Sequence, residues 1–173
     1  MKIIVSVSAT HDYDELDQKI DDLHREATHY KKTDLELSIS YLKEAKELMQ
    51  GKDNRLIEQW LRLPLFLQQS GRFDEAMVEF NLIIKNVRPR AEKRFGFLHQ
   101  PTRIKLCITS EKLRIYEKMQ LACKREKLPE MAKKYASLYN KCRMLHDGLS
   151  KKLAQEEDAK LARATKYLSS INQ

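Results

Sequence analysis

The stretch from Trp60 to Ile83, WLRLPLFLQQSGRFDEAMVEFNLI, constrains the fold more than any other part of the chain. Apolar residues recur at spacings of three and four on both sides of Gly71, which indicates two amphipathic helices. Gly71 permits the positive φ that a helix end favours, so it suits the turn between them. The pattern therefore predicts a helical hairpin with helices over about 54–69 and 73–86.

Similar patterns flank this hairpin. Periodic apolar residues predict helices over about 12–31 and 34–49, and again over 102–127 and onward from Pro129. Leu23 lies 37 residues before Trp60, and Leu42 lies 38 residues before Phe80. A two-helix unit that recurs at a nearly fixed period is the sequence signature of a helical-repeat protein.

The chain resembles the tetratricopeptide repeat family at the residues that carry that family's signature. Residues 71–76, GRFDEA, resemble its most typical turn, and Pro89 lies close to its closing proline. Pro64 and Ile83 depart from the pattern, which has glycine and alanine there. Residues 16–49 match more loosely and residues 113–142 more weakly still. The matching positions of the clear repeat are Trp60, Leu63, Leu67, Ala76 and Phe80, with Pro64 and Ile83 at the two departures.

The resemblance implies an all-α fold, a short right-handed α-solenoid of about three TPR-like hairpins with a long C-terminal helix. An irregular helical bundle that contains one such hairpin is the alternative. We expect a single domain over 1–173, and KIIVSVS at 2–8 fits either a short strand or an extended arm. Its expected parts are an N-terminal arm or strand (1–11), repeat 1 (12–50), repeat 2 (54–87), a basic connector (88–101), repeat 3 with its extended helix (102–153) and a tail helix (154–173).

The helix that begins at Pro129 carries apolar residues at alternating spacings of four and three, which is a heptad pattern. The pattern predicts a packing seam along this helix. Gly148 follows Asp147 near its middle and would either break the helix or weaken it by about 1 kcal/mol. The seam consists of Met131, Tyr135, Leu138, Cys142, Leu145 and Leu149.

Charge is distributed unevenly along the chain. The net charge is +8, but residues 1–87 carry an excess of acids and residues 88–173 an excess of bases. A basic C-terminal half indicates an acidic partner, which is a protein surface, nucleic acid or anionic lipid, although solvated helices show similar charges. The asymmetry would also allow two copies to meet head to tail as a homodimer.

Tetratricopeptide arrays expose the first helix of each repeat on a concave face, so the resemblance implies a partner site on residues 54–69 and 102–127. The second of these helices carries a basic stripe that could grip carboxylates or phosphates. The first carries a mixed and apolar stripe. The residues that we expect to contact a partner are Arg114, Lys118, Leu121, Lys124 and Arg125, together with Arg62, Leu65 and Gln69.

The expected connector, which could also hold a short helix, mixes basic and aromatic residues. Arg88, Arg90 and Arg94 could contact phosphates or an acidic partner, with the rings of Phe95 and Phe97 against bases. The reading that we favour instead places both rings in a core seam and leaves the charges in water.

Motifs for catalysis are missing from the sequence. Its five histidines are scattered, and it has neither a phosphate-binding glycine loop nor metal-ligand spacing. We expect no catalytic residue, metal or cofactor. Cys107, Cys123 and Cys142 lack CxxC spacing, which suits buried thiols in a reducing cytosol. We expect a soluble cytoplasmic protein with no membrane contact.

These observations predict a non-catalytic protein-binding module. It would be an adaptor, a chaperone-like factor or a specific inhibitor of the immunity-protein type, and its partner would be acidic or of mixed charge. The alternative is a helical protein that binds nucleic acid through its basic C-terminal half.

Overall fold

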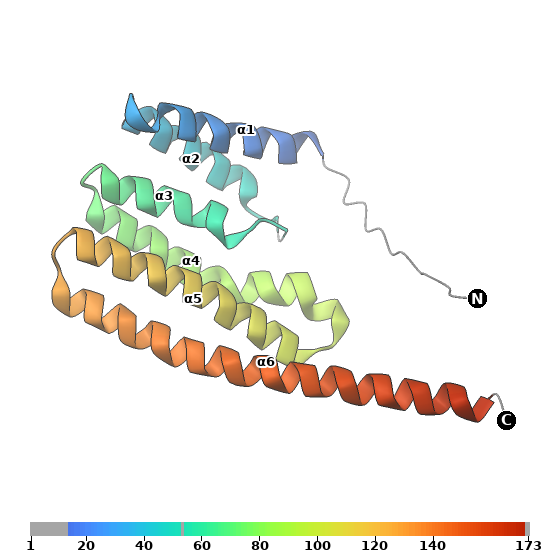
Figure 1. Cartoon of the computed structure of the whole chain (residues 1–173). Coiled ribbons are helices and arrows are strands. Elements are labelled where there is room, and N and C mark those ends of the chain that lie inside the picture. Colours follow the sequence, from blue (N-terminus) through green and yellow to red (C-terminus); the bar gives the residue numbers. More distant parts are fainter. Residues whose placement is uncertain (1–13, 53, 172–173) are drawn as a thin grey trace. The chain divides into compact units, whose positions relative to one another are not determined.

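The computed structural model describes residues 14–52 and 54–171, and this range is all-helical (Figure 1). It holds no strand, which confirms the all-α class. The predicted arm or strand over 1–11 lies outside the described residues. The helices are α1 (Glu15–His29), α2 (Leu35–Met49), α3 (Ile57–Gln69), α4 (Phe73–Phe95), α5 (Pro101–Arg125) and α6 (Pro129–Ile171), with short 3-10 helices at Tyr30–Lys32 and Gly96–Leu98.

Where the sequence predicts one domain, the structure divides into two compact units, the first ending at Gln50 and the second beginning at Gly51. The first unit contains the hairpin of α1 and α2. Each helix begins at an aspartate whose carboxylate accepts a backbone N–H, Asp14 from Asp17 at 2.7 Å and Asp34 from Leu37 at 2.9 Å. The hairpin buries Ile20, Leu23 and Ala27 of α1 and Ile39, Leu42, Ala45 and Met49 of α2.

The second unit packs α3, α4, α5 and α6 around one hydrophobic core. Phe80 and Val87 of α4 and Ile115 and Met119 of α5 are fully buried in it. α6 lies along α5 and contributes Ala132 and Tyr135, near its own start, to the core. α3 closes the core through Ile57 and Leu61, and it remains helical through the buried Pro64.

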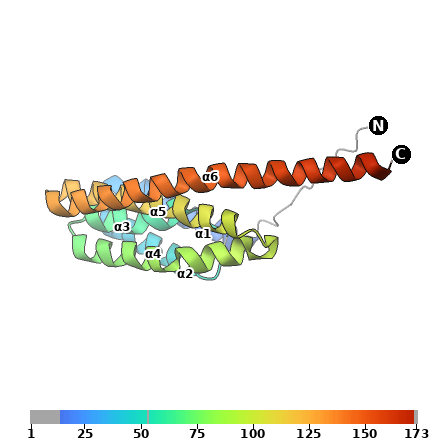
Figure 2. The same ribbon diagram turned by 90° about the horizontal axis from the view of Figure 1, so that it is seen from below.

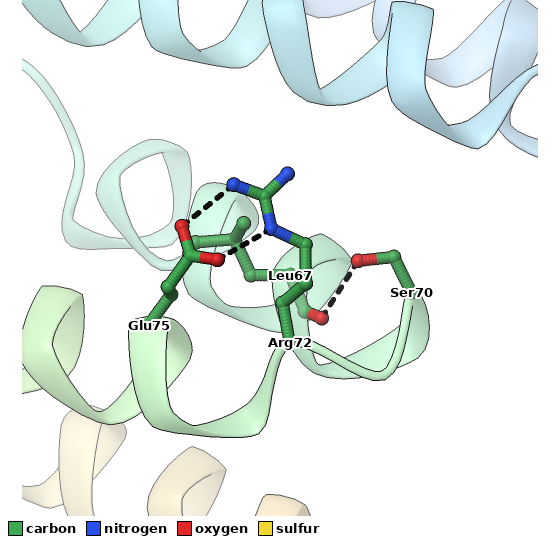
Figure 3. Close-up of polar contacts among 4 residues, drawn as sticks. All are labelled: Leu67, Ser70, Arg72 and Glu75. Carbon is green, nitrogen blue, oxygen red and sulfur yellow. Dashed lines mark hydrogen bonds and ion pairs between the residues drawn. The ribbon is translucent and has the colours of Figure 1, made fainter.

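The turns that follow α3 and α5 have the same hydrogen-bond pattern. Arg72 N–H donates to the Leu67 carbonyl at 2.9 Å, and Leu128 N–H donates to the Cys123 carbonyl at 2.9 Å. Each bond closes a helix end around one residue of positive φ, which is Gly71 at 82° and Lys127 at 57°. Two further contacts brace the first turn (Figure 3): Ser70 donates to the Leu67 carbonyl, and Arg72 pairs with Glu75.

The two corresponding helices, α3 and α5, run in the same direction side by side (Figure 1). Glu58 near the start of α3 pairs with Arg114, and Gln68 near its end bonds to Arg125 and Glu126. These pairs keep a nearly constant sequence offset of 56 to 58 residues. Gly71 and Lys127, the residues of positive φ, are also 56 residues apart.

The prediction of a connector over 88–101 is wrong for most of that segment. α4 continues as a helix through Pro89 to Phe95, and only the 3-10 helix Gly96–Leu98 and a short turn join it to α5. A proline inside a helix costs about 3 kcal/mol. Val87 and Ala91 on either side of it are buried, so the packing of α4 against the core outweighs this cost, and Pro89 itself faces solvent.

α6 is a single helix of 43 residues, so neither a break at Gly148 nor a separate tail helix over 154–173 is present. The predicted seam is wrong at Leu145, which is 55% exposed. His146 occupies the half-buried position towards α5 instead of Leu145, and the next half-buried residues of this seam are Leu149 and Leu153. A helix with 3.6 residues per turn drifts away from a repeat of 3.5, which moves the buried position by one residue. Figure 2 shows α6 extending beyond α5.

Candidate partner-binding face and an adjoining pocket

The structure brings the predicted contact residues of α3 and α5 onto one pair of adjacent helices. We call this the α3–α5 face. It lies entirely within the second unit, and a side-chain contact joins the two helices near each of its ends. The α3–α5 face comprises Arg62, Leu65 and Gln69 of α3 and Arg114, Lys118, Leu121, Lys124 and Arg125 of α5.

An exposed ion pair marks one end of the face. Arg114 Nε lies 3.6 Å from Glu58 Oε1, and both side chains are more than half exposed. A pair of this kind contributes at most about 1 kcal/mol to stability, because water screens it. A partner's carboxylate could therefore replace Glu58 beside Arg114 at little cost.

A buried amide organises the other end. Gln68 is 7% exposed, and its Nε2 donates to Glu126 Oε1 at 2.8 Å while its Oε1 accepts from Arg125 Nη1 at 3.2 Å. Gln68 thus holds the end of α5 against α3, whereas its neighbour Gln69 is exposed. This arrangement orients the Arg125 guanidinium rather than leaving it fully mobile.

The middle of the face combines apolar and cationic groups. Leu121 is 36% exposed, and Lys124 beside it is exposed as well. Lys118 is half-buried and lies 3.6 Å from Glu117. The Arg62 guanidinium lies 5.6 Å from the centre of the Phe66 ring, and burial lowers its pKa, although a guanidinium stays charged at neutral pH.

Leu65 differs from the expectation for a contact residue, because it packs partly against the core of the second unit. A half-buried leucine can form the floor of a contact surface but presents little area of its own. The apolar contribution of the face to a partner therefore rests mainly on Leu121.

The three arginines predicted as phosphate contacts do not form one strip. Arg90 points into the unit, where its Nη2 lies 2.7 Å from Glu111 Oε2 and its guanidinium stacks 5.1 Å from the centre of the Trp60 ring. Arg88 is exposed and paired with Glu92 one turn later at 3.2 Å. Arg94 stacks on Phe95 at 5.3 Å.

The aromatic residues near α4's end also differ from the expectation that both rings fill a core seam. Phe95 is half-buried, but Phe97 is 72% exposed in the 3-10 helix Gly96–Leu98. The connection between α4 and α5 is short, and Phe97 lies at the surface within it.

An open pocket of about 430 Å³ adjoins the face at Arg114. It lies where the start of α3, the end of α4, the first half of α5 and the middle of α6 meet. Sequence reasoning missed it, because its residues come from four helices with no shared motif. Its lining consists of Leu56, Ile57, Glu58, Arg94, Phe95, Arg103, Leu106, Cys107, Ser110, Glu111, Arg114, His146 and Leu153.

The pocket contains a thiol, but its environment does not activate it. Burial, and then the Glu111 carboxylate, raise the pKa of Cys107, while Arg94 and Arg90 oppose this shift. A thiol with a raised pKa stays protonated at neutral pH and is a poor nucleophile. Within residues 14–52 and 54–171, no three His, Cys, Asp or Glu side chains gather where they could hold a metal ion.

Comparison with protein-family models, curated proteins and solved structures finds no match for this chain. Among the helices that the structure describes, none is both long and apolar enough to cross a membrane.

Proposed function

We propose that this protein is a non-catalytic interaction module that binds an acidic or mixed-charge protein surface through the α3–α5 face. The observation that carries the proposal is the repetition between α3 and α5. The two helices run parallel, and side-chain contacts join them at both ends between residues a nearly constant number of positions apart in the sequence. Each helix ends in a turn of its own, and the two turns have the same hydrogen-bond pattern. Parallel first helices of successive hairpins are what a TPR-like repeat array would present to a partner.

The charges of the face support an acidic partner. Five of its eight residues are cationic. Glu58 and Glu117 form exposed pairs with two of them, Arg114 and Lys118, and Glu126 accepts a hydrogen bond from Gln68. Arginine and lysine at the rim of an interface steer an acidic partner and select its orientation. Leu121 supplies an exposed apolar group among them, and an apolar centre with a polar rim is the usual anatomy of a protein interface.

The proposal can be tested by photo-crosslinking followed by titration. A photo-reactive phenylalanine analogue at position 121 should crosslink a protein in the source cells, and the same analogue at the exposed Leu145 on α6 should not. The captured protein, once purified, should bind the native chain in solution. We expect the double variant K118E/K124E to weaken that binding by at least tenfold.

The matched control is K141E/K151E, which makes the same change in net charge at two exposed positions of α6. It should leave affinity within about twofold. Equal losses from both double variants would reject the face as the contact surface and indicate only a general charge effect.

Nucleic-acid binding through the basic half is the outcome that would replace the proposal. It predicts capture of RNA or DNA instead of protein, with affinity falling about 10³-fold or more between 50 and 200 mM salt for six or more phosphate contacts. The inward orientation of Arg90 and its enclosed pair with Glu111 take one of the cations on which that alternative depended away from the surface.

A further inference from the structure

Among the residues that the structure describes, the pocket beside Arg114 carries one positive charge that is not paired with an acidic side chain. Its lining contains three arginines and two glutamates. Arg114 pairs with Glu58, Arg103 pairs with Glu157 of α6, and Glu111 pairs with Arg90 of α4, which is not part of the lining. His146 lies on the α6 wall beside Asp147. Of the charged residues in the lining, Arg94 is the one that these ion pairs do not include.

Arg94 is half-buried at the end of α4, and in the described part of the chain it has no hydrogen bond or ion pair to an acid. Its guanidinium is held over the Phe95 ring, 5.3 Å from the ring centre. A cation held against an aromatic ring in a recess is partly dehydrated, so an anion that reaches it gains more than it would in open water. The planar guanidinium can bond a carboxylate or phosphate through two parallel N–H groups.

The remainder of the lining is largely apolar. Leu56, Phe95 and Leu153 come from three different helical segments, and Leu106 adds a fourth apolar wall. A volume of about 430 Å³ lies within the range of small-molecule and side-chain pockets. One cation beside apolar walls matches a ligand that has one anionic group joined to an apolar body.

We infer that this pocket is a binding site for an apolar group that bears a carboxylate or phosphate, with Arg94 holding the anion and Leu56, Phe95 and Leu153 contacting the apolar part. The ligand is either a free small acid or the C-terminal carboxylate of a polypeptide, which offer Arg94 the same chemistry. This site goes beyond the proposed function and does not depend on it, because Arg94, Phe95 and Leu153 are not part of the α3–α5 face.

The test uses the full chain and 3-phenylpropionate as the probe, with the neutral 3-phenylpropanamide as the matched ligand. Titrations followed by 1H–15N NMR should show shifts at the Arg94 side-chain Nε–H, at Ser110 and at His146. We expect the carboxylate to bind at least tenfold more tightly than the amide. Phenyl phosphate should bind as the carboxylate does.

Variants of Arg94 separate a specific anion site from a general effect of charge. R94Q should remove the preference for the acid over the amide, and R94K should keep part of it. R88Q, which removes an exposed arginine from the same helix, is the control and should keep all of it. Circular dichroism of each variant shows whether the fold is intact.

A second measurement does not depend on NMR. Because Arg94 and Cys107 both line the pocket, an acid bound at Arg94 should slow alkylation of Cys107 while leaving Cys142 unaffected, as read by mass spectrometry. Tetrapeptides that end in phenylalanine, with a free or an amidated C-terminus, distinguish a polypeptide end from a free small acid. Equal binding of 3-phenylpropionate and its amide, or an acid preference that survives in R94Q, would overturn the inference.

Discussion

Arg90 and Glu111 form an enclosed ion pair in the second unit. Arg90 Nη2 lies 2.7 Å from Glu111 Oε2, and each side chain is only 13% exposed. The same guanidinium stacks on the Trp60 ring at 5.1 Å. One side chain of α4 therefore joins α5 and α3, so this arginine, a candidate phosphate contact by sequence alone, is a structural residue.

Replacing Arg90 with methionine should lower the free energy of unfolding by about 2–4 kcal/mol, because it leaves the Glu111 carboxylate enclosed without its partner. R88M, which removes an exposed pair, should cost less than about 1 kcal/mol. Urea unfolding measures both. In a double-mutant cycle, R90M with E111Q should cost less than the sum of the two single changes. Equal effects of R90M and R88M would contradict the structural role.

Gly148 to alanine should stabilise the protein by about 0.5–1 kcal/mol. Gly148 lies inside α6, and apart from its chain neighbours and the nearby backbone of its own helix an added Cβ would meet no atom within 4 Å. The gain comes from the reduced backbone freedom of the unfolded chain. Thermal unfolding should show a higher midpoint. A decrease would mean that α6 is not continuous at this position.

The matching turns after α3 and α5 predict opposite effects of two substitutions. Lys127 adopts a φ of 57°, a conformation that glycine adopts without strain, so K127G should raise the free energy of unfolding by up to about 1 kcal/mol. G71A should lower it by about 1 kcal/mol, because Gly71 has a φ of 82°. Chemical denaturation of the two variants and the native chain makes the comparison. A loss of stability in K127G would show that the two turns are not equivalent.

Stability should fall in alkaline solution. Burial is the main cause that raises the pKa values of Cys107, Cys123 and Cys142, and also those of Tyr116 and Tyr135. The folded state then holds these protons more tightly than the unfolded state, so the stabilisation is complete below the unfolded thiol pKa of about 8.5 and is lost as pH rises above it. Denaturant midpoints between pH 7 and 11 test this expectation.

A single-cysteine change provides the control for that pH dependence. C107A should flatten part of the alkaline decline, because one of the groups with a raised pKa is removed. An unchanged slope in C107A would assign the decline to the other groups.

Removing the chain after Asp158 should change the unfolding free energy of the second unit by less than about 0.5 kcal/mol. From Glu157 to Ser169 every side chain is exposed, and the variant keeps the contacts of Glu156 with Thr102 and of Glu157 with Arg103 on α5. A truncation after Leu149 is the comparison. It removes those contacts and Leu153 as well, so it should cost substantially more in the same urea titration.

Local patterns in the sequence were enough to predict most helices. Apolar spacing placed α1, α2, α3 and α5 within a few residues, and Gly71 marked the turn before α4. The prediction failed where packing opposed local preference. By sequence alone Pro89 indicates a break in the helix, but the burial of Val87 and Ala91 keeps α4 helical around it.

Of the two candidate sites, one could be predicted from local patterns and the other could not. The cationic stripe of α5 could be predicted, because residues on one helix share a face at fixed spacings. The pocket could not, since Arg94, Cys107 and Leu153 belong to three helices and come together only when these pack. Whether an arginine is structural or available to a ligand also depends on packing, which separates Arg90 from Arg94.

The sequence by itself determined an all-helical chain with an acidic first half, a basic second half and a clear hairpin at Trp60–Ile83. Periodicity and charge are local properties, and they survive in any arrangement of the helices. Only the tertiary structure decided which charges are neutralised inside the second unit and which one is left in a recess. That outcome depends on distances between groups far apart in sequence, which apolar spacing does not encode.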